Sequence, residues 1–373
     1  MQATKPRRSL LRKPGVQTLL ASLICILLGL LVGYIALLII NPAGATEAIL
    51  DVIKNFWAYS KPEKQLKNFG VTLVTTAPLL MCSLSVLFAY KVGLFNIGAA
   101  GQYVAGAGAC LYCALALKLP WIVCLVAAIL AGALLGSISG ILKAYRNVNE
   151  VISCIMLNWI SLYLVNTLLT QVKNPTGKDT YTLASQNASA MLPTAGLSDI
   201  FNQKNVTIAI PLAILVCVLI WILLTKTQLG YELRATGLNK NAAKYCGMRD
   251  RFNIILTMAI AGGLAGMGAA LLYLSDFEQW AVTQASVPAM GFNGIAAAFL
   301  GGLNPIGAIF SSYFIQHITR GGTALTSTGV YSSQTSDLIT SVIIYMCGFV
   351  LFMKQAMNKR LDSRDQKKGG RKA

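Results

Sequence analysis

The sequence predicts an all-α polytopic membrane protein of eight to ten transmembrane helices, most simply ten. Of its 373 residues, 55% are hydrophobic and 12% are charged, whereas soluble domains carry about 25% charged residues. The apolar residues gather into runs, most of them close to the ~20 residues that cross a bilayer. The net charge of +18 comes from basic residues in the connections and tails between these runs. Such a charge fits loop bias in a membrane protein, so we expect lipid and no nucleic acid as its partner.

Ten hydrophobic segments are expected, and each is assigned from its apolar length. The third and the eighth carry glycine-rich phrases, so either could be a broken or re-entrant helix rather than a full span. The expected segments, in chain order, are 18–40, 69–90, 96–117, 120–142, 150–170, 206–225, 253–275, 288–302, 305–320 and 335–354.

Charge predicts the orientation. If residues 1–17 lie in the cytoplasm and the spans alternate, 22 Lys and Arg residues fall on the cytoplasmic side and 9 on the outside. This bias favours both termini inside. We therefore expect a basic cytoplasmic tail over 1–17, a transmembrane domain over 18–354 with a cytoplasmic loop at 226–251, and a second basic tail over 355–373.

Two related phrases interrupt the apolar pattern. Val92–Gln102 reads VGLFNIGAAGQ, and Gly291–Gly302 reads GFNGIAAAFLGG. Their glycines allow backbones to approach closely, and their amides bring polar groups to membrane depth. Phe95 and Phe292 lie about half a chain apart, which favours a duplicated transporter architecture with its substrate pathway at two matching helix breaks.

Uncharged amides suit a neutral polyhydroxyl substrate, because they form hydrogen bonds without the cost of a buried charge. Aromatic rings add stacking surfaces. For each amide the alternative is an interhelical hydrogen bond that only joins helices, and for each ring it is ordinary packing. The predicted pathway residues are Phe95, Asn96, Gln102, Asn158, Trp159, Asn166, Phe292 and Asn293.

The polar segment Gly230–Met248 interrupts the second half of the chain. We expect one short helix that stops at Gly237, then a second that is capped by Asn239, runs through Ala242 and Ala243, and stops at Gly247. Small alanines and flanking charges suit docking of a cytoplasmic motor, and the alternative is a solvated linker. The residues assigned to this coupling loop are Gly230, Glu232, Arg234, Ala235, Gly237, Asn239, Ala242, Ala243 and Gly247.

The chain offers few groups for covalent chemistry. Cys110 and Cys113 form a C-x-x-C pattern without a second Cys or His cluster, so we expect no metal site. The segment Asn174–Asp179 resembles the end of a phosphate-binding loop but lacks its first glycine and its final Ser or Thr. We therefore expect no cofactor and no enzymatic activity in this chain, with ATP and Mg²⁺ bound by a separate subunit.

Three stretches resemble the permease subunits of ABC importers of the simple-sugar and branched-chain amino-acid class. Gly93–Gln102 resembles the phrase GLFNIGxEGQ of the nucleoside-type, BMP-lipoprotein-linked branch. Asn149–Tyr163, NEVISCIMLNWISLY, resembles its phrase NEVISTxMLNYIA. The loop 230–248 resembles its coupling segment G-x-x-x-R-A-x-G-x-N-x-x-A-A-x-x-x-G.

This resemblance implies about ten helices, as in the vitamin B12 importer permease, and a bacterial cell-membrane location. It implies three partners: a second homologous permease, an ATP-binding subunit with nucleotide-binding domains, and an extracellular substrate-binding lipoprotein. The function implied is nucleoside import by alternating access, with simple-sugar (ribose-type) import as the neighbouring alternative. Ala100 departs from the family phrase, which often has Glu there, and this puts the role of that position in question.

Two other function classes are considered. An ion-coupled secondary transporter needs intramembrane acids, and this chain has almost none at mid-span. A membrane-embedded enzyme needs clustered His, Asp or Glu, and His317 is the single histidine. Asp276 and Glu278 end the seventh segment on the predicted outer side, where they meet either the binding protein or solvent.

Overall fold

The structure is a computed structural model that describes residues 14–327 and 332–369. These residues form helices joined by connections of varied length, which confirms the all-α class. The pairings Lys173 with Thr180 and Asp179 with Ala281 are isolated bridges, and the described residues contain no named strand. The basic residues of 1–13 and 370–373 lie outside the described residues.

All ten expected segments are helical. Their bounds are α1 (Pro14–Ile40), α3 (Pro62–Lys91), α4 (Ala99–Leu115), α5 (Trp121–Arg146), α6 (Glu150–Leu169), α9 (Ala209–Lys226), α12 (Asp250–Tyr273), α13 (Ala289–Leu300), α14 (Pro305–Ser327), and α15 (Ser333–Cys347), which is followed by α16 (Val350–Gly369). Shorter helices lie in the connections, namely α2 (Ala45–Lys54), α7 (Leu183–Gln186), α8 (Leu197–Ile200), α10 (Gln228–Leu238) and α11 (Lys240–Tyr245).

The number of membrane crossings is smaller than expected. Within the described residues, six helices are long and apolar enough to cross a bilayer, or seven if α15 and α16, bent by 40°, count as one span. The expectation of ten spans is not confirmed, because α4 has only 17 residues, α13 has only 12, and α14 is not among the helices that are apolar enough. These two short helices carry the glycine-rich phrases, as the sequence indicated.

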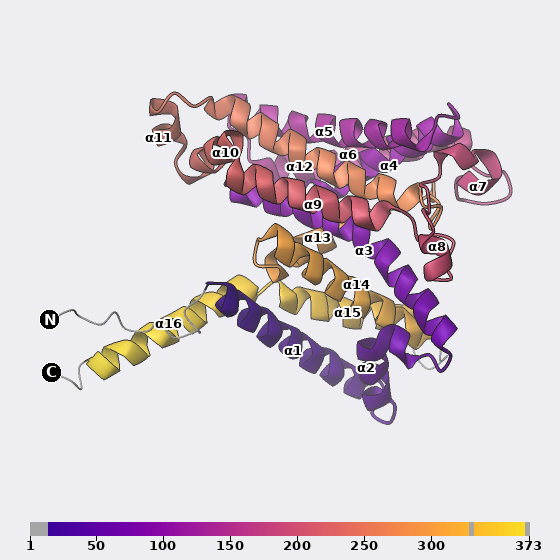
Figure 1. Cartoon of the computed structure of the whole chain (residues 1–373), viewed down its shortest axis with the longest axis horizontal. Coiled ribbons are helices and arrows are strands. Elements are labelled where there is room, and N and C mark those ends of the chain that lie inside the picture. The colour runs from indigo at the N-terminus through magenta and orange to yellow at the C-terminus, as the bar shows by residue number, and fades with distance from the viewer. Residues whose placement is uncertain (1–13, 328–331, 370–373) are drawn as a thin grey trace.

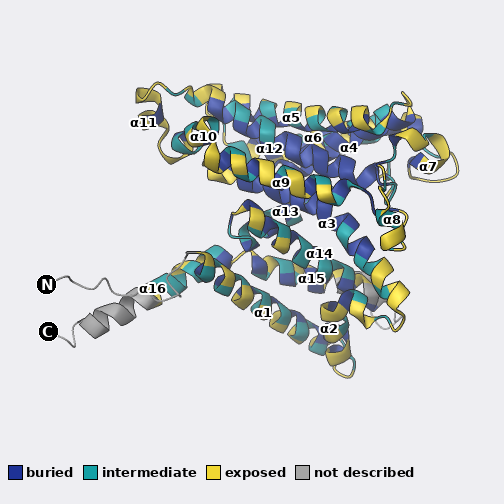
Figure 2. Ribbon diagram, in the orientation of Figure 1, coloured by how far each residue is buried: buried dark blue, intermediate teal, exposed yellow. Residues whose placement is uncertain are grey.

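The helices form two groups with α3 between them (Figure 1). One group contains α4, α5, α6, α9 and α12, and the other contains α1, α2, α13, α14 and α15. Helix α3 packs against α9 and α12 on one side and α13 and α14 on the other. It is buried almost throughout from Gly70 to Ala89, whereas α1 exposes much of its apolar surface (Figure 2). Helices α10 and α11 lie at the same end of the molecule as α16 and the start of α1; we call this the loop end.

Small residues bring α5 and α12 into direct backbone contact. Gly132 and Gly136 recur every four residues along α5, and Gly262 and Gly266 do so along α12. A Cβ added to Gly132 or Gly262 would overlap the backbone carbonyl of the other residue. Membrane helices gain little from burying apolar surface against one another, so they associate through such close packing. The glycine spacing therefore explains why α5 and α12 pack closely along much of their length.

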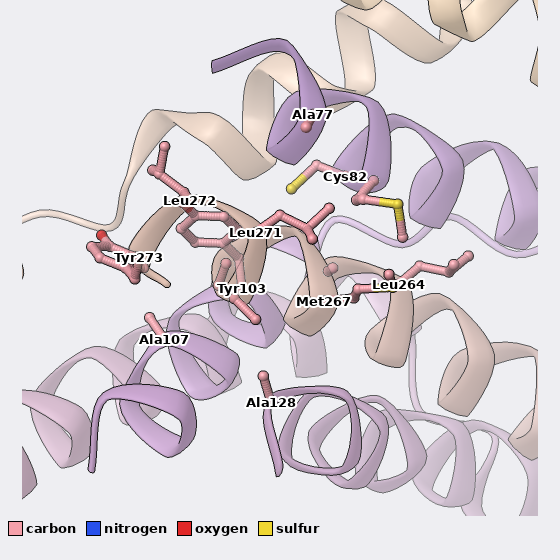
Figure 3. Close-up of a cluster of buried hydrophobic side chains, with 14 of the residues drawn as sticks. Ala77, Cys82, Tyr103, Ala107, Ala128, Leu264, Met267, Leu271, Leu272 and Tyr273 are labelled. Atoms are coloured by element: carbon pink, nitrogen blue, oxygen red, sulfur yellow. The ribbon is translucent and has the colours of Figure 1, made fainter. Parts of the chain in front are cut away.

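The core lies where α3, α4, α5 and α12 meet. Tyr103 of α4 packs against Tyr273 of α12 with ring centroids 6.2 Å apart. Figure 3 shows both rings together with Cys82 of α3 and Ala128 of α5, which are fully buried. This buried centre holds α4, whose first turn contains the end of the first glycine-rich phrase.

Candidate functional site

The first phrase is a turn held by buried amides. Helix α3 ends at Lys91, and Gly93 takes φ +78°, which turns the chain toward α4. Asn96 is fully buried and donates to the Gln102 side chain at 2.8 Å and to the Ser85 hydroxyl at 2.9 Å. Gln102 donates back to the Asn96 carbonyl oxygen at 3.1 Å. These two amides, both predicted to line a pathway, satisfy each other inside the protein.

Asn158 and Asn166 fasten α6 to its neighbours. The Asn158 carbonyl oxygen accepts from the backbone N–H of Gly101 at 2.8 Å, and its amide donates to the Ile97 carbonyl at 3.2 Å. Asn166 accepts from the Trp280 indole at 2.9 Å and donates to the Gln284 carbonyl, also at 2.9 Å. Both amides take the alternative role considered for them, interhelical or helix-to-loop hydrogen bonding.

The polar loop folds into two short helices. Asn239 caps α11, with its side chain accepting from the Ala242 N–H at 3.0 Å, and Gly247 follows α11 at φ +81°. Both features agree with the sequence prediction. Gly237, expected to end the first helix, instead lies within α10, which continues to Leu238. The prediction was wrong because this glycine allows a close backbone contact with a segment outside the loop.

That segment is the first phrase. A Cβ added to Gly93 would come 2.8 Å from the Gly237 carbonyl oxygen, and one added to Gly237 would overlap the backbone of Val92. The loop and the first phrase therefore touch backbone to backbone. Asn253 of α12 also donates to the Thr236 hydroxyl at 2.9 Å in a buried bond. Helix α10 is consequently attached to α12 and to the turn that precedes α4.

At its base α10 is held by several local contacts. Gly230 lies against the Leu223 carbonyl of α9, where a side chain would clash. The Arg234 guanidinium donates to the Gly230 carbonyl at 3.3 Å, and the Glu232 carboxylate accepts from the Gln228 amide at 3.1 Å. The Ala235 carbonyl accepts from the Asn239 N–H, which closes the last turn. The loop is thus an ordered element of the helical body rather than a loose linker.

The outer surface of the loop is apolar at two points. Leu238 is 89% exposed and Tyr245 is 94% exposed. Of the paired alanines, Ala242 lies at the surface, whereas Ala243 is buried beneath it. Lys240 pairs with Asp250 at 3.4 Å and closes the loop onto α12. Exposed apolar side chains on an ordered element outside the helical bundle are typical of a protein docking surface.

The second phrase has a different environment. Gly291 packs on Ala100, where an added Cβ would lie 2.7 Å from the Ala100 Cβ, so the two phrases meet at this contact. Phe292 is 41% exposed. Asn293 is half-buried and has no hydrogen-bond partner within the described part of the chain. Of the five amides predicted for the pathway, this is the one left available to a ligand.

Helix α6 exposes a continuous apolar face. Trp159 is 42% exposed and stacks on Tyr163, with ring centroids 6.2 Å apart and an interplanar angle of 24°. Phe95 is half-buried at the turn. Helices α6 and α13 each pack on α4. The sequence did not single out Tyr163, although its spacing of four residues from Trp159 places both on one helical face.

The two acids after α12 have separate surroundings. Asp276 accepts from the backbone N–H of Leu183 at 2.9 Å and of Ala184 at 3.3 Å, which holds the start of α7. Glu278 reaches solvent, but the protein atoms around its carboxyl remove part of its hydration; this desolvation raises the carboxyl pKa, and the positive charge of Arg320 opposes the shift. A search of the described residues finds no group of three or more His, Cys, Asp or Glu suited to a metal ion.

The region from α3 to α15 has known relatives. Residues 68–348 match the family described as "Branched-chain amino acid transport system / permease component". This match covers both glycine-rich phrases and the loop between α9 and α12. The chain belongs to this permease family. It is a transport component and a multi-pass protein of the bacterial cell membrane.

Several curated relatives of this permease carry transport names. "Guanosine ABC transporter permease protein NupP" of Bacillus subtilis is 32% identical over 91% of this chain and 96% of that protein. "Nucleoside ABC transporter permease protein NupB" of Lactococcus lactis is 34% identical over 87% and 89%. "Nucleoside ABC transporter permease protein NupC" of the same organism is 28% identical over 64% and 77%. A solved structure, "PsaBC from Streptococcus pneumoniae in complex with Fab", aligns at 16% identity and a TM-score of 0.43 over 82% and 95%, too loosely to bear on the fold.

Proposed function

We propose that this permease is the membrane subunit of an ATP-driven nucleoside importer. The observation that carries the proposal is the backbone contact between Gly237 of α10 and the turn at Val92–Gly93. Through it, a movement imposed on the loop reaches the start of α4 without an intervening flexible side chain. The relatives that transport guanosine and nucleosides support the substrate class.

The loop is the docking element for the ATP-binding subunit in this proposal. The exposed Leu238 and Tyr245 side chains fill a recess of that subunit, and Ala242 allows a close approach between them. ATP and Mg²⁺ bind to the partner, and its closure displaces α10 and α11. The loop end then faces the cytoplasm, as the bias of basic residues favours.

The movement passes along backbone contacts. Gly237 transfers it to Gly93, the hydrogen bonds of Asn158 hold the start of α4 on α6, and Ala100 transfers it to Gly291 on α13. The contacts at Gly237 and at Ala100 are backbone to backbone, so a small displacement at the loop changes the position of α13. Alternating access follows if α13 faces the passage.

Nucleoside recognition is assigned to α13. The exposed ring of Phe292 offers a stacking surface for a base, and the unpaired amide of Asn293 offers a donor and an acceptor for its edge or for the ribose. A neutral amide suits an uncharged nucleoside at membrane depth. The extracellular lipoprotein delivers the substrate at the end opposite the loop, near α7 and Glu278.

The second permease is assigned to the exposed apolar face of α6. Ile152, Met156, Trp159 and Tyr163 recur at helical spacing and are each more than 40% exposed. The occurrence of NupB and NupC as two nucleoside permeases in one organism supports a pair of unlike subunits.

The test is uptake into proteoliposomes that contain the complex purified through a tag on this chain. We expect radiolabelled guanosine to enter the vesicles only when ATP is present inside them. Other nucleosides should compete with this uptake, whereas ribose should not. An ATP-binding subunit that cannot hydrolyse ATP should abolish uptake. Uptake that persists with this inactive subunit contradicts the ABC mechanism, and displacement by ribose alone reassigns the substrate to simple sugars.

A further inference from the structure

A cavity of about 640 Å³ opens on the side of the helical body near the loop end. Its walls are two helical stripes, Gly15, Thr18, Ser22 and Ile26 of α1 and Ile306, Phe310 and Phe314 of α14, and the turn Leu300–Asn304 forms its floor. Volumes of this size are typical of ligand sites. Its lining is mostly apolar, so an aliphatic ligand suits it.

Measured along α1, the cavity is about as long as one leaflet of a bilayer is thick. From Gly15 to Ile26 the helix rises about 17 Å, and half of a hydrocarbon core is about 15 Å. Its outer edge is apolar and open, because Leu19 is 61% exposed, Ile306 is 48% exposed and Phe310 is 71% exposed. A chain from the surrounding lipid can therefore enter from the side.

Positive charge lies at one end of the cavity. Among the residues that the structure describes, Lys354 of α16 is the single ionisable one in the lining, and its ammonium donates to the Thr18 hydroxyl at 2.9 Å, near the start of α1. Lys91, at the end of α3, lies close enough to Lys354 and Arg234 for the positive charges to repel one another. In the sequence, five further Lys and Arg residues directly precede the cavity-lining Gly15. An apolar cleft with cations at the headgroup level complements an anionic lipid.

We propose that this cavity binds one phospholipid with an anionic headgroup. The headgroup lies at Lys354 beside Thr18, and an acyl chain lies between α1 and α14 over the Leu300–Asn304 turn. The lipid would then join α1 and α16 to the turn that follows α13. This places a lipid beside the helix to which substrate recognition was assigned, but the site does not depend on that assignment.

The test uses photo-crosslinking in nanodiscs. The complex is purified through a tag on the full-length chain and placed in phosphatidylcholine discs that contain phosphatidylglycerol with a diazirine on one acyl chain. We expect lipid adducts on peptides covering 15–26 and 300–314. The same diazirine on phosphatidylcholine should label these peptides several times less, because each basic residue near a headgroup contributes about a fivefold preference for an anionic lipid.

Two pairs of variants separate the charge from the apolar cleft. Lys354→Gln should lower phosphatidylglycerol labelling about fivefold, whereas Lys226→Gln, an exposed lysine at the end of α9, should not change it. Ile306→Trp should lower the labelling by both lipids, and Leu130→Trp, an exposed site on α5, should leave it unchanged. Thermal unfolding of each variant confirms that it is folded.

Three results would overturn the proposal. Equal labelling by both lipids removes the anionic preference. Labelling of 15–26 and 300–314 that is absent in the complex but present in the isolated chain assigns the cavity to a helix of a partner subunit. Labelling that rises severalfold after removal of residues 1–13 assigns it to the chain's own tail.

Discussion

The two Phe-Asn phrases are similar in sequence but are built into the protein in different ways. Asn96 lies in a non-helical turn and is fully buried, with every polar atom of its side chain bonded. Asn293 lies inside α13, is half-buried, and has no partner among the described residues. The comparison teaches that a repeated motif in a membrane protein can have two roles. In one half it supplies a structural joint, by which we mean a place where several backbones pack together, and in the other it supplies a ligand-accessible group.

The neighbours of the phrases explain the difference. The first packs against α6 and the α10 loop, and its two amides, Asn96 and Gln102, are buried. The second packs on the first through Gly291 but leaves Phe292 exposed. A joint tolerates change poorly, because several backbones meet there, whereas a ligand contact can be removed without disturbing the fold. This contrast orders the expected effects of mutation.

The largest effect is expected from Ala100→Glu, which restores the residue that the family phrase often has. Ala100 is fully buried, and Gly291 lies on its backbone. A carboxylate there has no room and loses its hydration, at a cost of several kcal/mol. We expect loss of folded protein by size-exclusion chromatography. Ala100→Ser is the matched control, and a well-folded, active Glu variant would show that the phrases are less tightly joined than their contact implies.

A smaller but still large effect is expected from Gly237→Leu. The new side chain displaces the turn at Val92–Gly93 and not the exposed docking side, so the variant should insert and its complex with the ATP-binding subunit should hydrolyse ATP. A coupling loss of about 1–3 kcal/mol lowers uptake about 5- to 150-fold. Uptake and ATPase activity are measured in the same proteoliposomes. As the control, Leu238→Ala should instead weaken association with the ATP-binding subunit. Normal uptake by Gly237→Leu would contradict the proposed route from the loop to α4.

The paired variants Asn96→Ala and Asn293→Ala test the comparison directly. Asn96→Ala leaves the Gln102 amide and the Ser85 hydroxyl without their partner, at about 1–3 kcal/mol for each buried group. We expect a lower Tm for this variant. Asn293→Ala should keep the Tm and raise the KM for nucleoside uptake. If the two variants exchange these results, the roles assigned to the phrases are reversed.

Much of the fold could be predicted from the sequence, because apolar length reports helices reliably. The caps at Asn149 and Asn239 were predictable as well, since a short polar side chain before a helix satisfies free N–H groups. The central place of α3 was not predictable from hydropathy. Lipid and protein interior are both apolar, so a buried span and a lipid-facing span have similar hydropathy.

The candidate site was harder to predict than the fold. Amides at membrane depth are rare enough to be noticed, but sequence cannot tell whether a neighbour satisfies them, and Asn96, Gln102, Asn158 and Asn166 all proved to be bonded within the chain. The sequence predicts a helix end at Gly237, because glycine is common at that position, whereas in the structure Gly237 packs against Gly93, more than a hundred residues away. Glycines spaced four apart in α5 and α12 would have located the central helix pair.

The smallest effect is expected from Phe292→Ala. Its ring is 41% exposed, so truncation removes little packing and should leave the Tm within error. If the ring stacks on a base, its loss weakens binding by about 1–3 kcal/mol, which raises the KM for guanosine without lowering the ATPase rate at saturation. Phe292→Tyr keeps the ring and should retain uptake. Phe95→Ala, at the half-buried turn of the first phrase, should act in the opposite way, with a lower Tm and an unchanged KM, because its ring belongs to the joint rather than to the passage.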